Sequence, residues 1–145
     1  MSVSGTPRNF SYTLTTNADK EVFWNIWTDV ENWPAFDIPL KEAKLKGEMR
    51  VGAIGSITTK QGQRSGFKIT HYNPGKGYSF TTQLPGCKLV VKRYFENRDK
   101  LTFTHNVYFE GPLTFLFSRM LGPSFMKALP PIMENLKTLA EEANR

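Results

Sequence analysis

Residues 107–122, VYFEGPLTFLFSRMLG, contain the change of pattern that decides the fold of this chain. Up to Glu110 apolar residues occupy alternate positions, which is typical of a strand with one buried face, and from Pro112 they recur at helical spacing. Proline suits a first helical position because its missing amide hydrogen has no partner there. The pattern predicts a strand that leads directly into a C-terminal helix.

The predicted C-terminal helix carries one apolar stripe, whose members recur at intervals of four and three. They are Phe125, Leu129, Ile132, Leu136, Leu139 and Ala143. We expect the helix to be interrupted at Gly122-Pro123, and to kink or restart at Pro130-Pro131, because proline removes helical hydrogen bonds. A kinked helix either arches over a cavity or follows the curvature of a sheet.

Upstream segments show the alternation of strands and are separated by turn signals. The predicted strands run from Phe10 to near Asn17 and over Glu42–Gly47, Gly55–Lys60, Ser65–Tyr72, Tyr78–Leu84, Lys88–Asn97 and Leu101–Glu110. Two short helices should follow the first strand. Asn17 or Asp19 is expected to cap the first helix, and Asp29 the second, which should stop around Trp33-Pro34.

The register of the last two strands follows from the rule that a slip of one residue reverses both faces. We place Leu89 opposite Phe109, Val91 opposite Val107, Arg93 opposite His105, and Phe95 opposite Phe103. The inner face then continues with Leu84, Thr82, Phe80, Tyr78, Phe67, Ile69 and His71. This inner wall is aromatic and holds few polar groups, whereas the opposite face is polar, as a sheet with one solvated side requires.

Length and composition indicate a single domain over residues 1–145, long enough to bury a core without disulfides. Cys87 is the only cysteine, which favours a reducing compartment, and the N-terminus lacks the apolar segment of a signal peptide, so we expect a cytoplasmic protein. The net charge is +6, but the basic residues are dispersed, and we expect no nucleic-acid partner. Neither metal-ligand spacing nor a phosphate-binding loop is present, so no metal and no cofactor are expected.

Three segments carry a resemblance to a known family: VFWNIWTDVENWPAFD at 22–37, VGAIG at 51–55, and FEGPL at 109–113 with the Leu-rich helix that follows. Together they resemble the SRPBCC superfamily, the START-like, birch-pollen-allergen-fold proteins that include polyketide cyclases and aromatases. The resemblance covers nearly the whole chain, and its strongest motif is the Trp-Pro segment. It implies an α+β helix-grip fold, in which a seven-stranded antiparallel sheet wraps around a long C-terminal helix and two short helices between the first two strands close one end of a hydrophobic cavity. Members of the superfamily differ widely in activity, so the fold alone implies no function.

Arg93 opposite His105 is the sharpest candidate site on the inner wall. A buried charge is costly, so an inward arginine has an acidic partner, lies near the wet mouth of the cavity, or awaits an anionic ligand. An Arg beside a His can hold a carboxylate or polarise a carbonyl, although a histidine on an apolar face is often an ordinary core residue. We expect a pocket of roughly 300 to 1,000 Å³ between sheet and helix. Its expected lining is Tyr12, Trp27, Phe67, Ile69, Tyr78, Phe80, Arg93, Phe103, His105, Phe125, Leu129 and Met133.

The interpretation that follows is a protein that binds, and thereby transports or sequesters, a small hydrophobic or amphipathic ligand. One alternative is a cyclase, aromatase or dehydratase-like enzyme that works without metal, with Arg93 and His105 as candidate catalytic residues. The other is a protein-interaction module of the chaperone-activator type. The cluster of Phe115, Leu116, Phe117, Met120 and Leu121 is broader than one helix face needs, which indicates peripheral membrane contact or a second subunit. The chain is accordingly a monomer or a homodimer.

Overall fold

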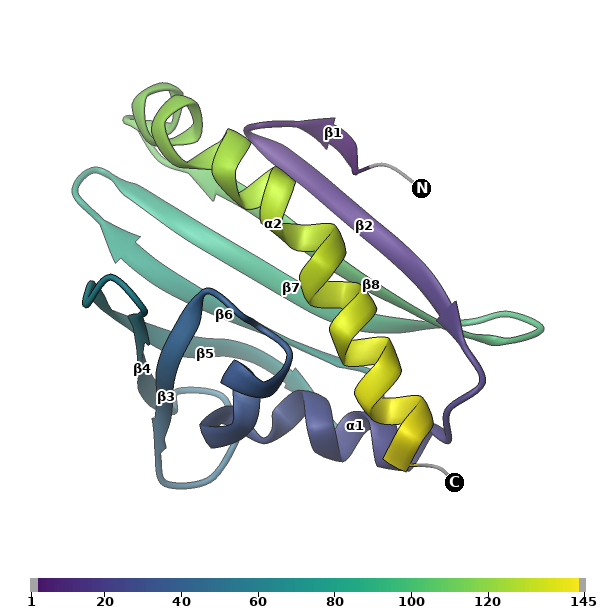
Figure 1. Ribbon diagram of the computed structural model, residues 1–145. Helices are drawn as coiled ribbons and strands as arrows, with labels where there is room; N and C mark the ends of the chain where they lie inside the picture. The colour runs from purple at the N-terminus through teal and green to yellow at the C-terminus, as the bar shows by residue number, and fades with distance from the viewer. Residues whose placement is uncertain (1–2, 144–145) are drawn as a thin grey trace.

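The computed structural model describes residues 3–143, which form one antiparallel sheet with a long helix lying across its concave face (Figure 1). The expected α+β, helix-grip architecture is confirmed. Residues 1, 2, 144 and 145 of the predicted domain lie outside the described residues.

The sheet has eight strands in the order β1-β2-β8-β7-β6-β5-β4-β3. Their bounds are β1 Ser4–Thr6, β2 Asn9–Thr16, β3 Leu40–Lys46, β4 Ile54–Thr59, β5 Arg64–Asn73, β6 Gly77–Leu84, β7 Cys87–Asn97 and β8 Leu101–Glu110. The helices are α1 Lys20–Thr28, the 3-10 helix η1 Val30–Ala35, and α2 Thr114–Ala143. The expected count of seven strands omits β1, a three-residue edge strand whose residues are all exposed and so give no apolar alternation.

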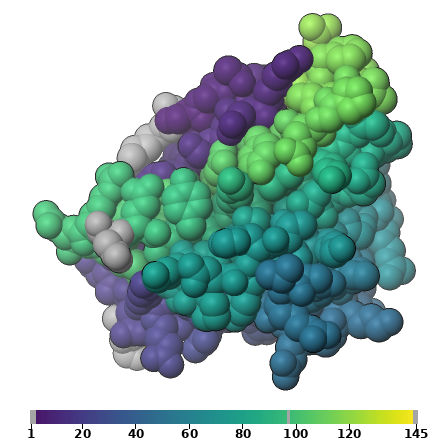
Figure 2. All heavy atoms as spheres, turned by 180° about the vertical axis from the view of Figure 1, so that it is seen from behind, coloured from purple at the N-terminus to yellow at the C-terminus, as the bar shows by residue number. Residues whose placement is uncertain are grey.

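The predicted register of β7 and β8 is confirmed, including Arg93 opposite His105 and Phe95 opposite Phe103. Phe103 is fully buried and Lys92 is exposed, so the inner and outer faces are assigned as expected. α2 lies across the inner face, against β2, β7 and β8. The outer face of the sheet is free of helices and is seen from behind in Figure 2.

The prediction that His71 lies on the inner wall is wrong, because β5 contains a β-bulge. Ile69 pairs with Phe80, but the next pair is His71 with Ser79, so Thr70 is an extra residue between them. The bulge turns His71 to the exposed outer face and brings Tyr72 inward, where its ring lies 6.0 Å from that of Trp24. An added residue of this kind leaves no trace in an alternating pattern.

α2 runs without interruption from Thr114 to Ala143, so the expected break at Gly122-Pro123 is wrong, as is a restart at Pro130-Pro131. Pro123 and Pro131 are exposed, so the carbonyls that lose a partner on that side of the helix can be solvated by water. The buried stripe then continues on the other side through Leu129, Met133 and Leu136. Packing against the sheet therefore keeps one helix where propensity alone predicts two.

Gly122 allows the β1–β2 turn to approach α2 closely. A Cβ added at Gly122 would lie 2.6 Å from the carbonyl oxygen of Pro7, which no real side chain tolerates. The absence of a side chain at this point permits the N-terminal hairpin to pack directly on the helix backbone.

α1 and η1 close one end of the sheet. The Asp19 side chain accepts hydrogen bonds from the amides of Glu21 and Val22, so Asp19, rather than Asn17, is the cap of α1. Asp29 occupies the position before η1 without a capping hydrogen bond from its side chain. Trp27 of α1 and Trp33 of η1 are both buried, so this end is filled by large aromatic rings.

Candidate ligand-binding site

Four polar side chains lie in one line across the inner face of the sheet. Tyr78 on β6 pairs with Arg93 on β7, Arg93 pairs with His105 on β8, and His105 pairs with Tyr12 on β2. All four are buried, with exposed fractions of at most 6%. We call these four residues the polar row. The antiparallel register alone aligns them, because directly opposite residues point to the same face.

Aromatic rings surround the guanidinium of Arg93. Its central carbon lies 4.7 Å from the ring centre of Trp33, 5.0 Å from that of Phe80, 5.8 Å from that of Tyr78, and 5.9 Å from that of Phe36. Ring faces attract cations, which offsets part of the cost of burying the charge. Two of the four rings, Trp33 and Phe36, come from η1 and the residue after it, so this short helix supplies much of the cage.

The hydrogen bonds of Arg93 are incomplete. One Nη donates to the hydroxyl of Tyr78 at 2.8 Å, and that hydroxyl in turn donates to the carbonyl of Trp27. The same carbonyl accepts the indole N–H of Trp33 at 3.0 Å, so Tyr78 is fully engaged in holding the end of α1. The Nε of Arg93 is buried and has no partner among the described residues. A donor left in this state costs free energy until an acceptor reaches it.

No carboxylate among residues 3–143 forms an ion pair with Arg93; the two ion pairs found there are Lys44 with Glu42 and Arg98 with Glu96. Asp37, which follows η1, is near enough for the charge of Arg93 to act on it. Burial raises the pKa of Asp37 to about 6, although Arg93 opposes that shift. Near neutral pH this carboxyl group is mostly ionised, but it forms no ion pair with Arg93, so the cation at the centre of the fold has a nearby charge without a direct partner.

His105 lies between a cation and a phenol. Burial and the charge of Arg93 together lower its pKa well below the usual value, so the imidazole is neutral. On its other side, burial and the charge of Glu134 raise the pKa of Tyr12, so that hydroxyl keeps its proton. Burial also raises the pKa of Tyr78. Arg93 is thus flanked by neutral groups that can donate or accept hydrogen bonds, which is an arrangement suited to a polar head group.

The structure brings the predicted lining residues together around this polar row. Trp27, Phe67, Ile69, Phe80, Phe103, Leu129 and Met133 are buried in one apolar cluster with Tyr12 and Tyr78, and Phe125 packs against it partly exposed. Sequence reasoning missed Trp33, Phe36 and Asp37 as neighbours of Arg93. The sequence feature that contains them is the Trp-Pro segment, which indicates the fold but does not indicate that these residues contact Arg93.

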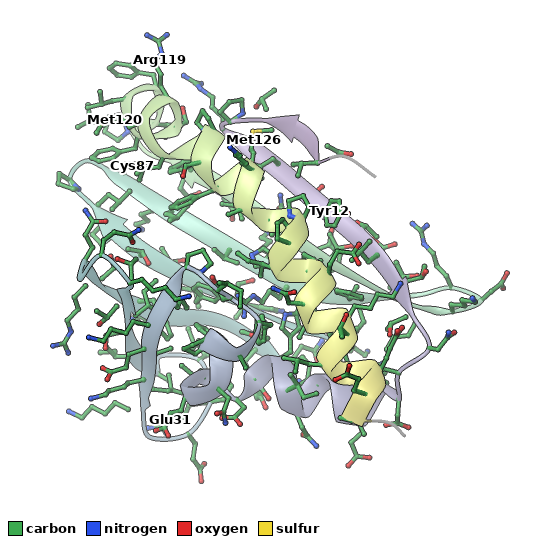
Figure 3. All side chains as sticks on the ribbon, in the orientation of Figure 1. Tyr12, Glu31, Cys87, Arg119, Met120 and Met126 are labelled. Atoms are coloured by element: carbon green, nitrogen blue, oxygen red, sulfur yellow. The ribbon has the colours of Figure 1, made fainter. Side chains whose placement is uncertain are left out.

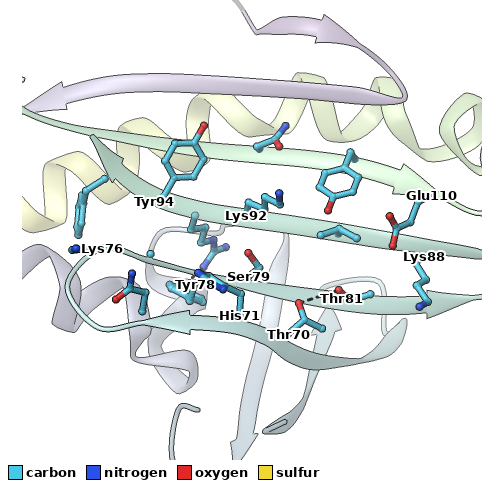
Figure 4. Close-up of a pocket in the computed structure, with 17 residues that line it drawn as sticks. Thr70, His71, Lys76, Tyr78, Ser79, Thr81, Lys88, Lys92, Tyr94 and Glu110 are labelled. Carbon is cyan, nitrogen blue, oxygen red and sulfur yellow. Dashed lines mark hydrogen bonds between the residues drawn. The ribbon is translucent and has the colours of Figure 1, made fainter. Parts of the chain in front are cut away.

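The hollows on the surface of residues 3–143 that are described next do not lie between sheet and helix, where the pocket was expected. One, of about 760 Å³, opens on the outer face of the sheet (Figure 4) and the other, of about 460 Å³, lies beside Trp24 at the β5–β6 turn. The outer hollow has small residues such as Ser79 and Thr81 on its floor, with Lys76, Lys88 and Lys92 around it. Lys92 lies over the ring of Tyr108 at 5.3 Å. Arg93 borders the outer hollow, but it is only 2% exposed and its guanidinium lies among the four rings on the inner face.

The described residues contain no group of three or more metal-ligating side chains. Nor does any helix within residues 3–143 have the length and apolarity needed to cross a bilayer.

Comparison with solved structures shows the fold. A protein from Mesorhizobium loti matches with a TM-score of 0.76 and 16% identity over 95% of this chain and 100% of its own. A protein from Arthrobacter aurescens matches with a TM-score of 0.74 and 17% identity, covering 98% and 92%. The ZhuI aromatase/cyclase of a Streptomyces species matches with a TM-score of 0.74 and 12% identity, covering 95% and 96%.

No protein-family model and no curated protein matches the sequence. At these identities the solved structures show that the chain shares their fold, and they show nothing more specific than that.

Proposed function

We propose that this protein binds a small amphipathic molecule between the sheet and α2, with an acidic or carbonyl head group on Arg93 and an apolar body among the aromatic residues. The observation that carries the proposal is the Nε of Arg93, a buried donor with no partner on a side chain with no ion pair. An anionic acceptor at this point would supply both the missing hydrogen bond and the missing charge.

Binding requires the core to open. Arg93 is only 2% exposed, and the residues around it are in contact, so the ligand has to displace apolar side chains as it enters. Phe125 of α2 and Leu89 of β7 pack against the core but are only partly buried, so we infer that the ligand enters on their side. The cavity of the bound state is therefore created by the ligand.

A catalytic role is less well supported. A general base needs a partner that fixes its orientation, and no carboxylate among the described residues lies within hydrogen-bond or ion-pair distance of His105. The likeness to the ZhuI aromatase/cyclase concerns the fold and carries no chemistry to these residues.

The test has two steps. Native mass spectrometry of freshly purified protein should show a co-purifying small molecule. Titration with decanoic acid and with decanol should then show preference for the acid, and Arg93→Met should weaken binding of the acid by about 1.5 to 3 kcal/mol while leaving the alcohol nearly unchanged. Arg93→Lys, which keeps the charge but lacks Nε, should give an intermediate loss.

Circular dichroism establishes that each variant is folded before its affinity is interpreted. Equal binding of acid and alcohol by the natural protein, or acid binding unaffected by Arg93→Met, would contradict the proposal. Conversion of a co-purifying molecule to a product, lost in His105→Ala with affinity retained, would replace the binding role by catalysis.

A further inference from the structure

The start of α2 carries a patch of large apolar side chains that point into solvent. Phe115 is 57% exposed, Leu116 is 42% exposed and Met120 is 62% exposed. They lie at the end of the molecule where α2 begins, and Arg119 and Met120 both project there (Figure 3). In the space-filling view the same segment, in lime green, stands out at one corner (Figure 2). Leaving three such side chains in water is costly unless a partner covers them.

The patch is one continuous face of the helix. At 3.6 residues per turn, positions 115, 116, 119, 120, 123 and 127 fall within an arc of about 140°. Every one of these six residues is exposed, whereas Ser118, Gly122 and Leu129, which lie just outside this arc beside Phe115, are buried. We call this set of six the outer face of α2. Its apolar members are joined by two cations, Arg119 and Lys127.

Charge decides between the candidate partners. Between Glu110 and Glu134 the sequence contains no acidic residue, and neither Arg119 nor Lys127 takes part in an ion pair among the described residues. A second copy of the chain docking on the same surface would bring like charges together across a two-fold axis. An anionic lipid surface, in contrast, neutralises both cations and receives the apolar side chains at the boundary of head groups and acyl chains.

We propose that the outer face of α2 docks the protein on an anionic lipid bilayer, with Phe115, Leu116 and Met120 inserted between head groups and Arg119 bound to them. This surface is separate from the polar row, which lies on the inner face of the sheet. The proposal therefore stands independently of what Arg93 binds.

The experiment is co-sedimentation of the full chain with vesicles of phosphatidylcholine, with and without phosphatidylserine. The natural protein should bind the mixed vesicles at least about tenfold more tightly, and added salt should weaken that binding. Phe115→Ser and Met120→Ser should each lower partitioning by about tenfold. Arg119→Ser should lower it by about fivefold on the mixed vesicles only. Val51→Ser is the matched control, because Val51 is 61% exposed on the β3–β4 loop, and it should change nothing.

Equal binding to both kinds of vesicle, or no binding to either, would overturn the proposal, as would an equal loss in Val51→Ser. Sedimentation velocity supplies the other decisive result. A dimer that dissociates in Met120→Ser, without vesicle binding by the natural protein, would assign the patch to a second copy. Because the replaced residues are exposed, the variants should melt at the temperature of the natural protein, so loss of binding cannot be attributed to unfolding.

Discussion

A guanidinium enclosed by four rings is attracted by their faces but is not neutralised by them. The cage around Arg93 is built from residues of β6, η1 and the turn after η1, so both the sheet and the closing helix contribute to it. The nearby acidic group, Asp37, is itself destabilised by burial in its ionised form. The site therefore holds two charged groups, the guanidinium of Arg93 and the carboxyl group of Asp37, and burial deprives both of water.

The burial of Asp37 makes the free energy of unfolding depend on pH. The pKa of Asp37 is raised to about 6 in the folded protein, so the fold favours its protonated form. The associated stability is fully present below about pH 4 and is lost as pH rises through about 6. Asp37→Asn should therefore be more stable than the natural protein above about pH 7, by about 1 to 2 kcal/mol, and equal to it near pH 4.

Urea unfolding at several pH values measures this difference. Asp99→Asn, in the exposed β7–β8 turn, is the control and should show no such trend. A constant difference between Asp37→Asn and the natural protein across the whole range would show that Asp37 ionises normally.

The same residue should also affect binding. Ionised Asp37 competes with an anionic ligand for the charge of Arg93, so we expect Asp37→Asn to bind decanoic acid more tightly at neutral pH and decanol with unchanged affinity. Isothermal titration with the two ligands measures this, and weaker acid binding in Asp37→Asn would show that the carboxyl group assists the ligand instead.

At the scale of elements, the contact between α2 and the N-terminal hairpin depends on Gly122. Gly122→Ala should destabilise the protein by about 1 to 3 kcal/mol, because the added methyl group would meet the carbonyl of Pro7 at 2.6 Å. Gly66→Ala on β5 is the matched control, since its nearest atom would be 3.8 Å away, and it should change the free energy of unfolding by less than about 0.5 kcal/mol. Thermal unfolding of the Gly122→Ala and Gly66→Ala variants measures this difference. Similar melting temperatures for the two variants would mean that the β1–β2 hairpin moves away from α2 to accommodate the methyl group.

Some features of the strands and helices could be predicted from the sequence, and others could not. Alternation and turn signals predicted the register of β7 and β8, because a buried face tolerates no slip. They did not predict the bulge that turns His71 outward, since one inserted residue is invisible without its hydrogen bonds. The continuity of α2 through its prolines was missed for a related reason: local rules forbid it, and only tertiary packing permits it.

The candidate site was predictable in part for the same physical reasons. Arg93 and His105 could be paired because they lie on adjacent strands of a predictable hairpin. Trp33 and Asp37 could not be placed beside Arg93, because their position depends on how η1 folds back over the sheet, and sequence spacing carries no information about that angle.

At the scale of the whole molecule, the chain should unfold as one cooperative unit. The described residues share a single sheet and one continuous core, so global unfolding should be a single transition. Urea unfolding followed by far-ultraviolet circular dichroism and by tryptophan emission should give the same midpoint. Separate midpoints would mean that the end closed by α1 and η1 unfolds on its own.

The distribution of tryptophan adds an optical consequence. Trp24 and Trp27 lie in α1 and Trp33 in η1, and the chain has no others. The start of α2 lies at the far end of the molecule and contains no tryptophan, so it contributes nothing to the tryptophan emission (Figure 1). Intrinsic fluorescence reports events at the cage of Arg93, where the indole of Trp33 lies against the guanidinium. A dye attached near position 120 reports contact with a vesicle. Tryptophan emission and dye emission can be recorded in the same sample at separate wavelengths. A single titration then shows whether ligand binding near Arg93 changes the binding of the outer face of α2 to lipid.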